Sequence, residues 1–481
     1  MSDKVIFEKG TQGRKGYTLP KLDVPYKEIS SLIPENFIAE NEKQLPEVSE
    51  LDVIRHYSKL ASKNFSVDSH LYPLGSCTMK YNPRINEELA RLSGFVNIHP
   101  YQNEESQQGV MELIYLTEKY LCEIAGMDAF TLQPAAGAHG EYAAILMTRK
   151  WFELKNENRN SILVPDSSHG TNPASAAMAG MNVKQISSNE NGTVNLEDLA
   201  NHLDENTACF MMTNPNTLGI FENDIVKIAG MVHEKGGLLY YDGANLNASM
   251  GIVRPGDAGF DFVHINVHKT FSTPHGGGGP GAGPVGAKNE LVKLLPVPRI
   301  VKNGERYAFN YDCPDTIGRM KAFYGNFSVL VKTLAYILTL GRENIKHVSE
   351  MAVLNANYML TKLKTIFDIP YGDSCMHEFV ASAVKQKEKG VNAADICKRL
   401  LDYGYHAPTV YFPLIVEEAL MIEPTETESK ETLDGFISAV EAIQAEINDN
   451  PEIVTSAPHT MPIKRLDGVA AARKPNLRWT P

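Results

Sequence analysis

Short apolar runs alternate with helical stretches between residues 96 and 324. Four runs end at polar residues and a turn: NSILVP (160–165), TACFMMT (207–213), GLLYYD (237–242) and FDFVHI (260–265). The segments between them, such as 196–206 and 225–236, carry apolar residues at helical spacing. This alternation predicts an α/β domain with a mostly parallel sheet covered by helices on both faces. Because ligands bind beyond the carboxyl ends of such strands, candidate functional residues should follow each run.

The pattern changes on both sides of this domain. Residues 1–95 are punctuated by prolines and contain one amphipathic stretch, 49–62. They predict an N-terminal arm that wraps a larger body or a second subunit. Residues 325–481 open with a long helical stretch that contains Gly341, and then strand and helix patterns alternate. They predict a connecting helix pair and a small C-terminal α+β domain with a basic tail.

Composition narrows the class of protein. The 481 residues include 46 basic and 58 acidic side chains, for a net charge of −12. Without a sustained Lys/Arg stripe, we expect no nucleic-acid binding. The six cysteines show no C-x-x-C pair and no zinc-ligand spacing, which predicts buried free thiols, no metal and a reducing compartment. No apolar run approaches the ~20 residues that span a bilayer, and the start lacks an apolar signal segment, so we expect no membrane and a cytoplasmic protein.

The most distinctive segment is INVHKTFSTPHGGGGPGAGPVG, residues 265–286. One interpretation is a dinucleotide fingerprint of a nicotinamide oxidoreductase, because G-x-G-x-x-G is matched by Gly276, Gly278 and Gly281. This match is weak, since any glycine cluster satisfies it, the segment lies past mid-chain, and prolines interrupt it. The other interpretation is a Schiff-base lysine. Lys269 follows an apolar run, where packing can remove its charge and let it attack an aldehyde.

Polar residues that follow the earlier runs favour the lysine interpretation. Asp242 closes the run 237–242 and could hold a pyridine nitrogen protonated, although it could equally cap a helix. His169 could stack on a flat cofactor ring or be an ordinary loop residue, and Asn214 could bond a ring hydroxyl. A helix N-terminus attracts phosphate, and the small residues that precede one such helix are Ala136, Gly137 and Ala138.

The order of these elements resembles that of aspartate-aminotransferase-type, fold type I pyridoxal-phosphate enzymes. The lysine segment also resembles that of the glycine cleavage system P-protein, a pyridoxal-phosphate glycine decarboxylase. Further segments similar to that family are 70–86, 132–146, 166–181, 214–222 and 240–248. The resemblance covers essentially the whole chain. It is to the carboxyl half of the long-chain form, which carries the lysine, and so to subunit 2 of the split form.

The resemblance implies roles for individual residues. Lys269 would form the Schiff base, Asp242 would face the pyridinium nitrogen, and His169 would stack on the ring and take part in catalysis. Cofactor contacts are also implied for Ala136, Gly137, Ala138, Asn214, Asn245 and His268. Candidates for substrate or interface contacts are Ser76, Cys77, Thr78 and His275, although the arm segment 76–78 could instead serve only in packing.

The resemblance implies glycine decarboxylation with transfer of the aminomethyl group to the lipoyl arm of the H-protein. The implied partners are a homologous subunit 1, with two copies of each subunit, and the lipoylated H-protein. The alternative is another fold type I enzyme, such as an aminotransferase or a desulfurase. For these, Arg399 lies in a helical stretch rather than at a strand end, and Cys313 and Cys375 lie in no matching loop motif.

Overall fold

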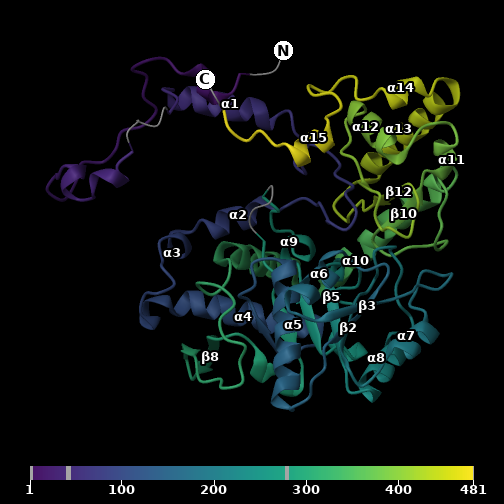
Figure 1. The fold of residues 1–481 in the computed structure, drawn as a ribbon, viewed down its shortest axis with the longest axis horizontal. Helices are drawn as coiled ribbons and strands as arrows, with labels where there is room; N and C mark the ends of the chain where they lie inside the picture. Colours follow the sequence, from purple (N-terminus) through teal and green to yellow (C-terminus); the bar gives the residue numbers. More distant parts are fainter. Residues whose placement is uncertain (1–3, 40–44, 277–280, 480–481) are drawn as a thin grey trace. The chain divides into compact units, whose positions relative to one another are not determined.

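The computed structural model describes residues 4–39, 45–276 and 281–479. The chain divides into two compact units, Met1–Ser66 with Thr460–Pro481, and Val67–His459. Within the described residues, the first unit contains α1 (Glu50–Ala61), α15 (Gly468–Arg473) and three short 3-10 helices (Figure 1). Ser49 caps α1. Its hydroxyl accepts from the backbone N–H of Asp52, and the Asp52 carboxylate accepts from the backbone N–H of Ser49. The helix predicted over 49–62 is therefore confirmed.

The second unit is built around a sheet whose seven described strands follow the order β1-β7-β6-β5-β4-β2-β3 (Figure 1). The strands are β1 (Ala129–Thr131), β2 (Ser161–Pro165), β3 (Asn182–Ile186), β4 (Thr207–Thr213), β5 (Leu238–Gly243), β6 (Phe262–Ile265) and β7 (Val285–Ala287). Strand β7 is antiparallel to both of its neighbours, and the pairs from β6 to β3 are parallel. The predicted mostly parallel sheet is confirmed.

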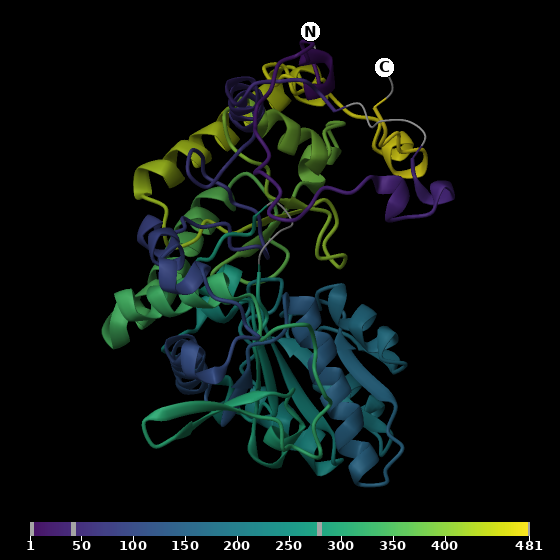
Figure 2. The same cartoon turned by 90° about the vertical axis from the view of Figure 1, so that its left-hand side faces the viewer.

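Helices cover both faces of this sheet (Figure 2). Successive strand residues belong to different apolar cores: Tyr241 and Val263 pack in one core, and Tyr240 and Phe262 pack in the other. The helices of this region are α2 (Arg84–Ala90), α3 (Ser93–Val96), α4 (Gln108–Ala125), α5 (Gly137–Leu154), α6 (Thr171–Met178), α7 (Leu196–His202), α8 (Ile225–Glu234) and α9 (Val267–Thr270). Gly126 ends α4 in the left-handed conformation, with φ 71°, as its position after the periodic stretch predicts.

A second, smaller sheet lies in the carboxyl-terminal part of this unit. Its strands follow the order β10-β12-β11, and they are β10 (Phe379–Ser382), β11 (Thr409–Val410) and β12 (Ala419–Ile422). The helices there are α10 (Phe327–Leu363), α11 (Val384–Lys387), α12 (Ala393–Asp402), α13 (Lys430–Asp449) and α14 (Glu452–Thr455). Helix α10 is broken at Gly341 (φ 66°, ψ 176°), which confirms the predicted helix pair.

Some elements were not predicted from the sequence. Strand β3 has no continuous apolar run, and most of its residues are exposed or half-buried. Strand β7 lies at the end of the glycine-rich segment, and β8 (Arg299–Asn303) pairs with β9 (Arg306–Asn310) in a separate hairpin. No helix among the described residues combines the length and apolar character needed to cross a bilayer.

Candidate active site

Lys269 lies on a single turn of helix that begins immediately after a buried strand. Strand β6 ends at Ile265, and α9 covers Val267–Thr270. The ammonium Nζ of Lys269 donates a hydrogen bond to the carbonyl of Ser76 at 2.7 Å. The side chain is half-buried rather than solvated. The structure therefore joins the predicted lysine to the arm segment that the sequence also singled out.

Asp242 lies at the end of the neighbouring strand β5 and is 2% exposed. Its Oδ1 accepts from the backbone N–H of Ala244 at 3.0 Å and lies 3.5 Å from His264 Nε2. With the Asn172 amide nitrogen turned toward the carboxylates, it donates to Asp242 Oδ2 at 3.1 Å and to Glu141 Oε2 at 3.0 Å. Hydrogen bonds thus fix this buried carboxylate beside the lysine strand.

His169 follows β2 and belongs to the same electrostatic cluster. Its Nδ1 lies 2.8 Å from the hydroxyl of Thr171, which in turn donates to Glu141 at 2.8 Å. Burial, and secondarily the Lys269 ammonium, lower the pKa of His169. A neutral imidazole held in this way presents a flat apolar surface, as stacking on an aromatic ring requires.

Glu141 belongs to the same cluster and was missed by sequence reasoning. It lies in the second turn of α5, 3% exposed, between the hydroxyls of Thr171 and Ser175. Burial and the nearby Asp242 carboxylate raise the pKa of Glu141 to about 8. Its place one turn beyond the predicted phosphate turn was the signal that could have identified it.

The small-residue turn forms the N-terminus of α5. Ala136 is the N-cap residue and Gly137 is the first helical residue. A Cβ at Gly137 would collide with the Asn266 amide, so glycine lets the helix approach the end of the lysine strand. Because the first N–H groups of a helix have no intrahelical acceptor, the backbone here, including Ala138, can bind an anion.

Two histidines flank the lysine. The rings of His268 and His275 are perpendicular, with centroids 5.1 Å apart. Burial, followed by the neighbouring positive groups, lowers the pKa of His268 to about 3 and that of His275 to about 4. Both are therefore neutral near pH 7, and each has one buried ring nitrogen without a protein partner in the described structure. Gly278 of the fingerprint interpretation falls in 277–280, outside the described residues.

The arm segment reaches the lysine through an unusual turn. Ser76 and Thr78 have positive φ angles of 65° and 47°, which are uncommon for residues other than glycine. Their backbone N–H groups donate to Glu378 at 2.6 Å and to Glu423 at 2.9 Å. Cys77 between them is half-buried, and burial raises the pKa of its thiol.

The two predicted asparagines, Asn214 and Asn245, make hydrogen bonds within the protein. The Asn214 side chain accepts from the backbone N–H of Glu222 at 2.9 Å, and so it braces the following loop. The Asn245 amide donates to the carbonyl of Pro215 and to Glu378, while its Oδ1 is buried and has no hydrogen-bond partner among the described residues. Of the pair, Asn245 is the one whose contacts lead to the lysine cluster.

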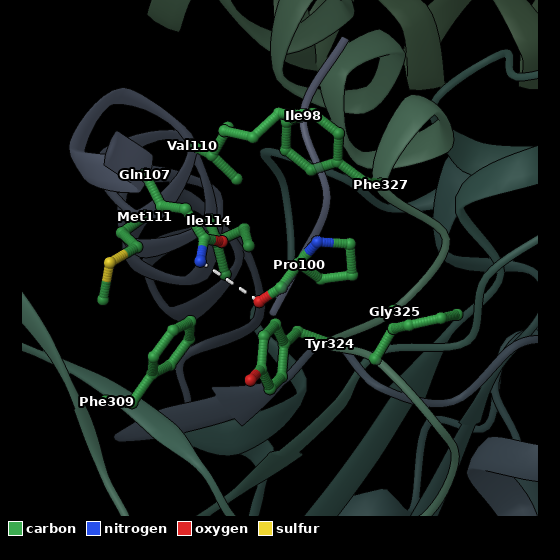
Figure 3. Close-up of a pocket in the computed structure, with 11 residues that line it drawn as sticks. Ile98, Pro100, Gln107, Val110, Met111, Ile114, Phe309, Tyr324, Gly325 and Phe327 are labelled. Carbon is green, nitrogen blue, oxygen red and sulfur yellow. Dashed lines mark hydrogen bonds between the residues drawn. The ribbon is translucent and has the colours of Figure 1, made fainter. Parts of the chain in front are cut away.

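An apolar cavity of about 200 Å³ lies elsewhere, between α4, β9 and the segment before α10 (Figure 3). Gln107 at its edge donates to the carbonyl of Pro100 at 3.1 Å. Its lining includes Met111, Phe309 and Phe327, and contains no lysine, histidine or carboxylate. The reactive groups are therefore gathered around Lys269 and not at this cavity.

Comparison with known proteins agrees with this geometry. Residues 23–308 match the family model of the glycine cleavage system P-protein, and residues 348–461 match that of the glycine dehydrogenase C-terminal domain. The chain is 57% identical to a probable glycine dehydrogenase (decarboxylating) subunit 2 of Caldanaerobacter subterraneus subsp. tengcongensis, over 99% of both chains. It is 59% identical to the protein of that name from Fervidobacterium nodosum, over 98% of this chain and 99% of the relative.

Solved structures share the fold. A crystal structure of glycine decarboxylase (P-protein) of the glycine cleavage system, in inhibitor-bound form, aligns with a TM-score of 0.74 at 18% identity, over 86% of this chain and 95% of that one. A Lactobacillus brevis glutamate decarboxylase aligns with a TM-score of 0.63 at 11% identity, over 85% and 96%. The predicted fold type I architecture is thereby confirmed. By its sequence along almost its whole length, the chain belongs to the glycine cleavage system P-protein family.

Proposed function

We propose that this chain is the lysine-bearing subunit of a two-subunit, pyridoxal-phosphate-dependent glycine decarboxylase. The observation that carries the proposal is the pairing of two strand ends. Asp242 is the penultimate residue of strand β5, strand β6 leads to Lys269, and Asp242 lies opposite His264 in the parallel register. A buried acid and an amine at adjacent strand ends are the two groups that a pyridine aldehyde requires.

The residues present suit pyridoxal phosphate. The N-terminus of α5 offers backbone N–H groups to a phosphate. Buried polar atoms on His268, His275 and Asn245 have no partner in the part of the chain that the structure describes, and they offer further hydrogen bonds. The neutral ring of His169 offers a stacking surface, and Asp242 offers an anion to a protonated ring nitrogen. We assign these residues, with Ala136, Gly137 and Ala138, to the cofactor.

The chain's own groups would then act as follows. When bound, pyridoxal phosphate supplies the electron sink for breaking a bond at the substrate α-carbon. Asp242 keeps the ring nitrogen protonated, and Asn172 with Glu141 hold the Asp242 carboxylate in place. Lys269, once free of the aldehyde, is the proton carrier between the steps. The neutral His169 orients the ring.

The partners are a homologous subunit 1 and a lipoylated H-protein that accepts the aminomethyl group, with two copies of each subunit in the assembly. The curated relatives are named as subunit 2, which supports a two-chain enzyme. The arm supports a further protein contact, because it exposes large apolar side chains, among them Tyr17, Leu19 and Phe37 at 72%, 76% and 74%.

Contacts in the structure argue against the alternative enzymes. An aminotransferase would use an arginine for the substrate carboxylate, but Arg399 is paired with Glu446 at 2.6 Å and with Asp402 at 3.0 Å. A desulfurase would need a reactive thiol, but burial raises the pKa of Cys375 to about 12.

The test is exchange of labelled bicarbonate into the carboxyl group of glycine. It uses this chain with pyridoxal phosphate and a lipoylated H-protein, with and without subunit 1. We expect exchange only when both subunits are present. Absence of exchange from a complex whose cofactor spectrum responds to other amino acids would contradict the proposal and favour a different pyridoxal-phosphate reaction.

A further inference from the structure

Two glutamates and a histidine form a buried cluster that the proposed mechanism does not use. Glu378, Glu423 and His377 are each 0% exposed. One carboxylate oxygen of each glutamate and one ring nitrogen of the histidine all lie within 4.8 Å of one another. Glu378 precedes β10 and Glu423 follows β12. Because Phe379 pairs with Ile422 in the antiparallel register, the strands bring the two carboxyl groups to the same end of the small sheet.

Both carboxyl groups hold the turn that contacts Lys269. Glu378 accepts from the backbone N–H of Ser76, and Glu423 accepts from the backbone N–H and the hydroxyl of Thr78 at 2.9 and 2.6 Å. Ser76 and Thr78 adopt positive φ angles, and such a backbone persists only where its surroundings fix it. The Ser76 carbonyl that accepts from Lys269 is therefore positioned by the two glutamates.

The surrounding charges cannot neutralise two carboxylates. Lys80 is committed to Glu426 at 2.6 Å. His377 Nε2 lies 3.6 Å from Glu378 and 3.9 Å from Glu423, but burial, followed by Lys269, lowers the pKa of His377 to about 3, so the ring is neutral.

Three further titratable groups face the pair. Lys269 supplies one positive charge. Glu426, although paired with Lys80, also raises the pKa of Glu423. The Cys77 thiol is neutral, because burial raises its pKa. Burial raises the pKa of Glu423 to about 7, and burial together with Glu423 raises the pKa of Glu378 well above its ordinary value. Two carboxyl groups that lie this close together and are buried away from water do not both ionise at neutral pH.

We propose that Glu378 and Glu423 hold one proton between them near neutral pH, and that this pair, acting through the Ser76–Thr78 turn, positions Lys269 and sets the pH at which its nitrogen titrates. The inference rests on the proposed function, in which Lys269 carries the cofactor. As pH rises, the pair passes from one negative charge to two. The second charge stabilises a protonated nitrogen on Lys269. Glu378 and Glu423 are positioning residues, because they act through the turn and not on the substrate.

The first test follows the visible absorbance of the cofactor on Lys269 from pH 6 to 10, in the complex with subunit 1. Glu423→Gln and Glu378→Gln each limit the pair to one negative charge and keep a hydrogen-bond acceptor. We expect either change to lower the midpoint of the absorbance titration by about one pH unit. Glu428→Gln is the matched control, since burial alone raises the pKa of Glu428 to about 7, and it should leave the midpoint unchanged.

Thr78→Val provides an independent variant, because it removes only the hydroxyl that donates to Glu423 and leaves both carboxyl groups in place. We expect a midpoint shift here as well. A purely structural role would lower the melting temperature of these variants and leave the midpoint in place. Unchanged midpoints in Glu423→Gln and Glu378→Gln would overturn the proposal.

The second test detects the proton itself and needs no cofactor. Infrared difference spectra between the wild-type chain and the Glu378→Gln/Glu423→Gln double variant should show the carbonyl stretch of one protonated carboxyl group at pH 7. Absence of this band, or a stoichiometric divalent ion that chelation removes from the wild-type chain, would overturn the shared proton. Failure of the complex to bind pyridoxal phosphate would count against the proposed function, while the infrared result still decides this inference.

Discussion

The candidate site brings together residues that lie at strand ends in different parts of the chain. Asp242 lies at the carboxyl end of strand β5, Lys269 follows the adjacent parallel strand β6, and His169 follows β2. Each has hydrogen-bond partners that fix its position, and a shared set of charges links all three. Substitutions at these positions therefore separate the roles of the groups.

Lys269→Ala should abolish glycine turnover, because no other group in the proposed mechanism can form the Schiff base or carry the proton. The cofactor should bind weakly and lose the absorbance of its lysine-linked form. Both effects are measured by bicarbonate exchange and by spectroscopy. Lys293→Ala, which changes an exposed lysine paired with Asp315, is the control and should retain full activity. Substantial exchange by Lys269→Ala would refute the assignment.

Asp242→Asn should retain cofactor and lower the rate of exchange by on the order of 100-fold or more, because a neutral amide does not hold the ring nitrogen protonated. The comparison is of exchange rates at saturating glycine, with cofactor content measured in the same samples. A rate within a few-fold of wild type would remove Asp242 from the mechanism.

Glu141 makes the stability of the chain depend on pH. Its folded-state pKa is about 8 against an ordinary value of 4.5, so between these values the folded chain holds a proton that the unfolded chain has released. The contribution of Glu141 to the free energy of unfolding should therefore fall as pH rises from 4.5 to 8. Urea denaturation at several pH values should show a flatter dependence in Glu141→Gln, and identical slopes would contradict this prediction.

Sequence reasoning identified three candidate site residues that end or follow an apolar run, Lys269, Asp242 and His169, and the structure places them in one cluster. It missed Glu141 and Glu378, which do not follow such a run. Glu378 precedes its strand, and nothing local shows that it faces Glu423. That pairing depends on the register of two antiparallel strands, which the pattern of apolar residues does not specify.

At the scale of elements, α5 shows how closely a helix must approach the sheet to complete the site. A Cβ at Gly140 would lie 2.7 Å from the carbonyl of Gly283 and 3.2 Å from the Cβ of His264. Glycine here permits contact with the strand that leads to the lysine. Strand β7, by contrast, could not be predicted, because glycines and prolines hide its short apolar pattern.

Gly140→Ala should therefore destabilise the chain by about 1–3 kcal/mol, because the methyl group has no space and the backbone must move. Gly230→Ala in α8 is the matched control. A Cβ there meets nothing within 4 Å, so the higher helix propensity of alanine should stabilise the chain by up to about 1 kcal/mol. Chemical denaturation measures both values, and equal effects of the two substitutions would contradict the packing argument.

At the scale of the whole molecule, the structure separates residues 1–66 and 460–481 from the unit that holds the site. The division into 1–95, 96–324 and 325–481 stays a prediction. The segment 67–95, assigned to the arm from its prolines, belongs to the unit Val67–His459 and supplies the turn beside Lys269. A polar, irregular sequence does not show whether a segment is a free arm or is held by carboxyl groups from a distant part of the chain.

The exposed apolar side chains of the arm predict its role in assembly. Leu19→Ser combined with Phe37→Ser should weaken association with subunit 1 at least tenfold, because the complex would bury both apolar side chains away from water. Sedimentation or titration calorimetry of the two subunits measures the change. Leu414→Ser, at an 87% exposed position outside the arm, should bind normally. Equal binding by all variants would place the interface elsewhere.

The hydrogen bonds between Thr78 and Glu423 also bear on how the protein is made. The two residues are 345 positions apart, and Glu423 comes 154 positions after Lys269 (423 − 269). During synthesis the lysine leaves the ribosome long before the carboxyl group that fixes its turn, and contacts of such separation form late. A nascent or truncated chain that already displays Lys269 therefore lacks the finished site, so tight cofactor retention marks a chain that has been completed and folded to its carboxyl-terminal sheet.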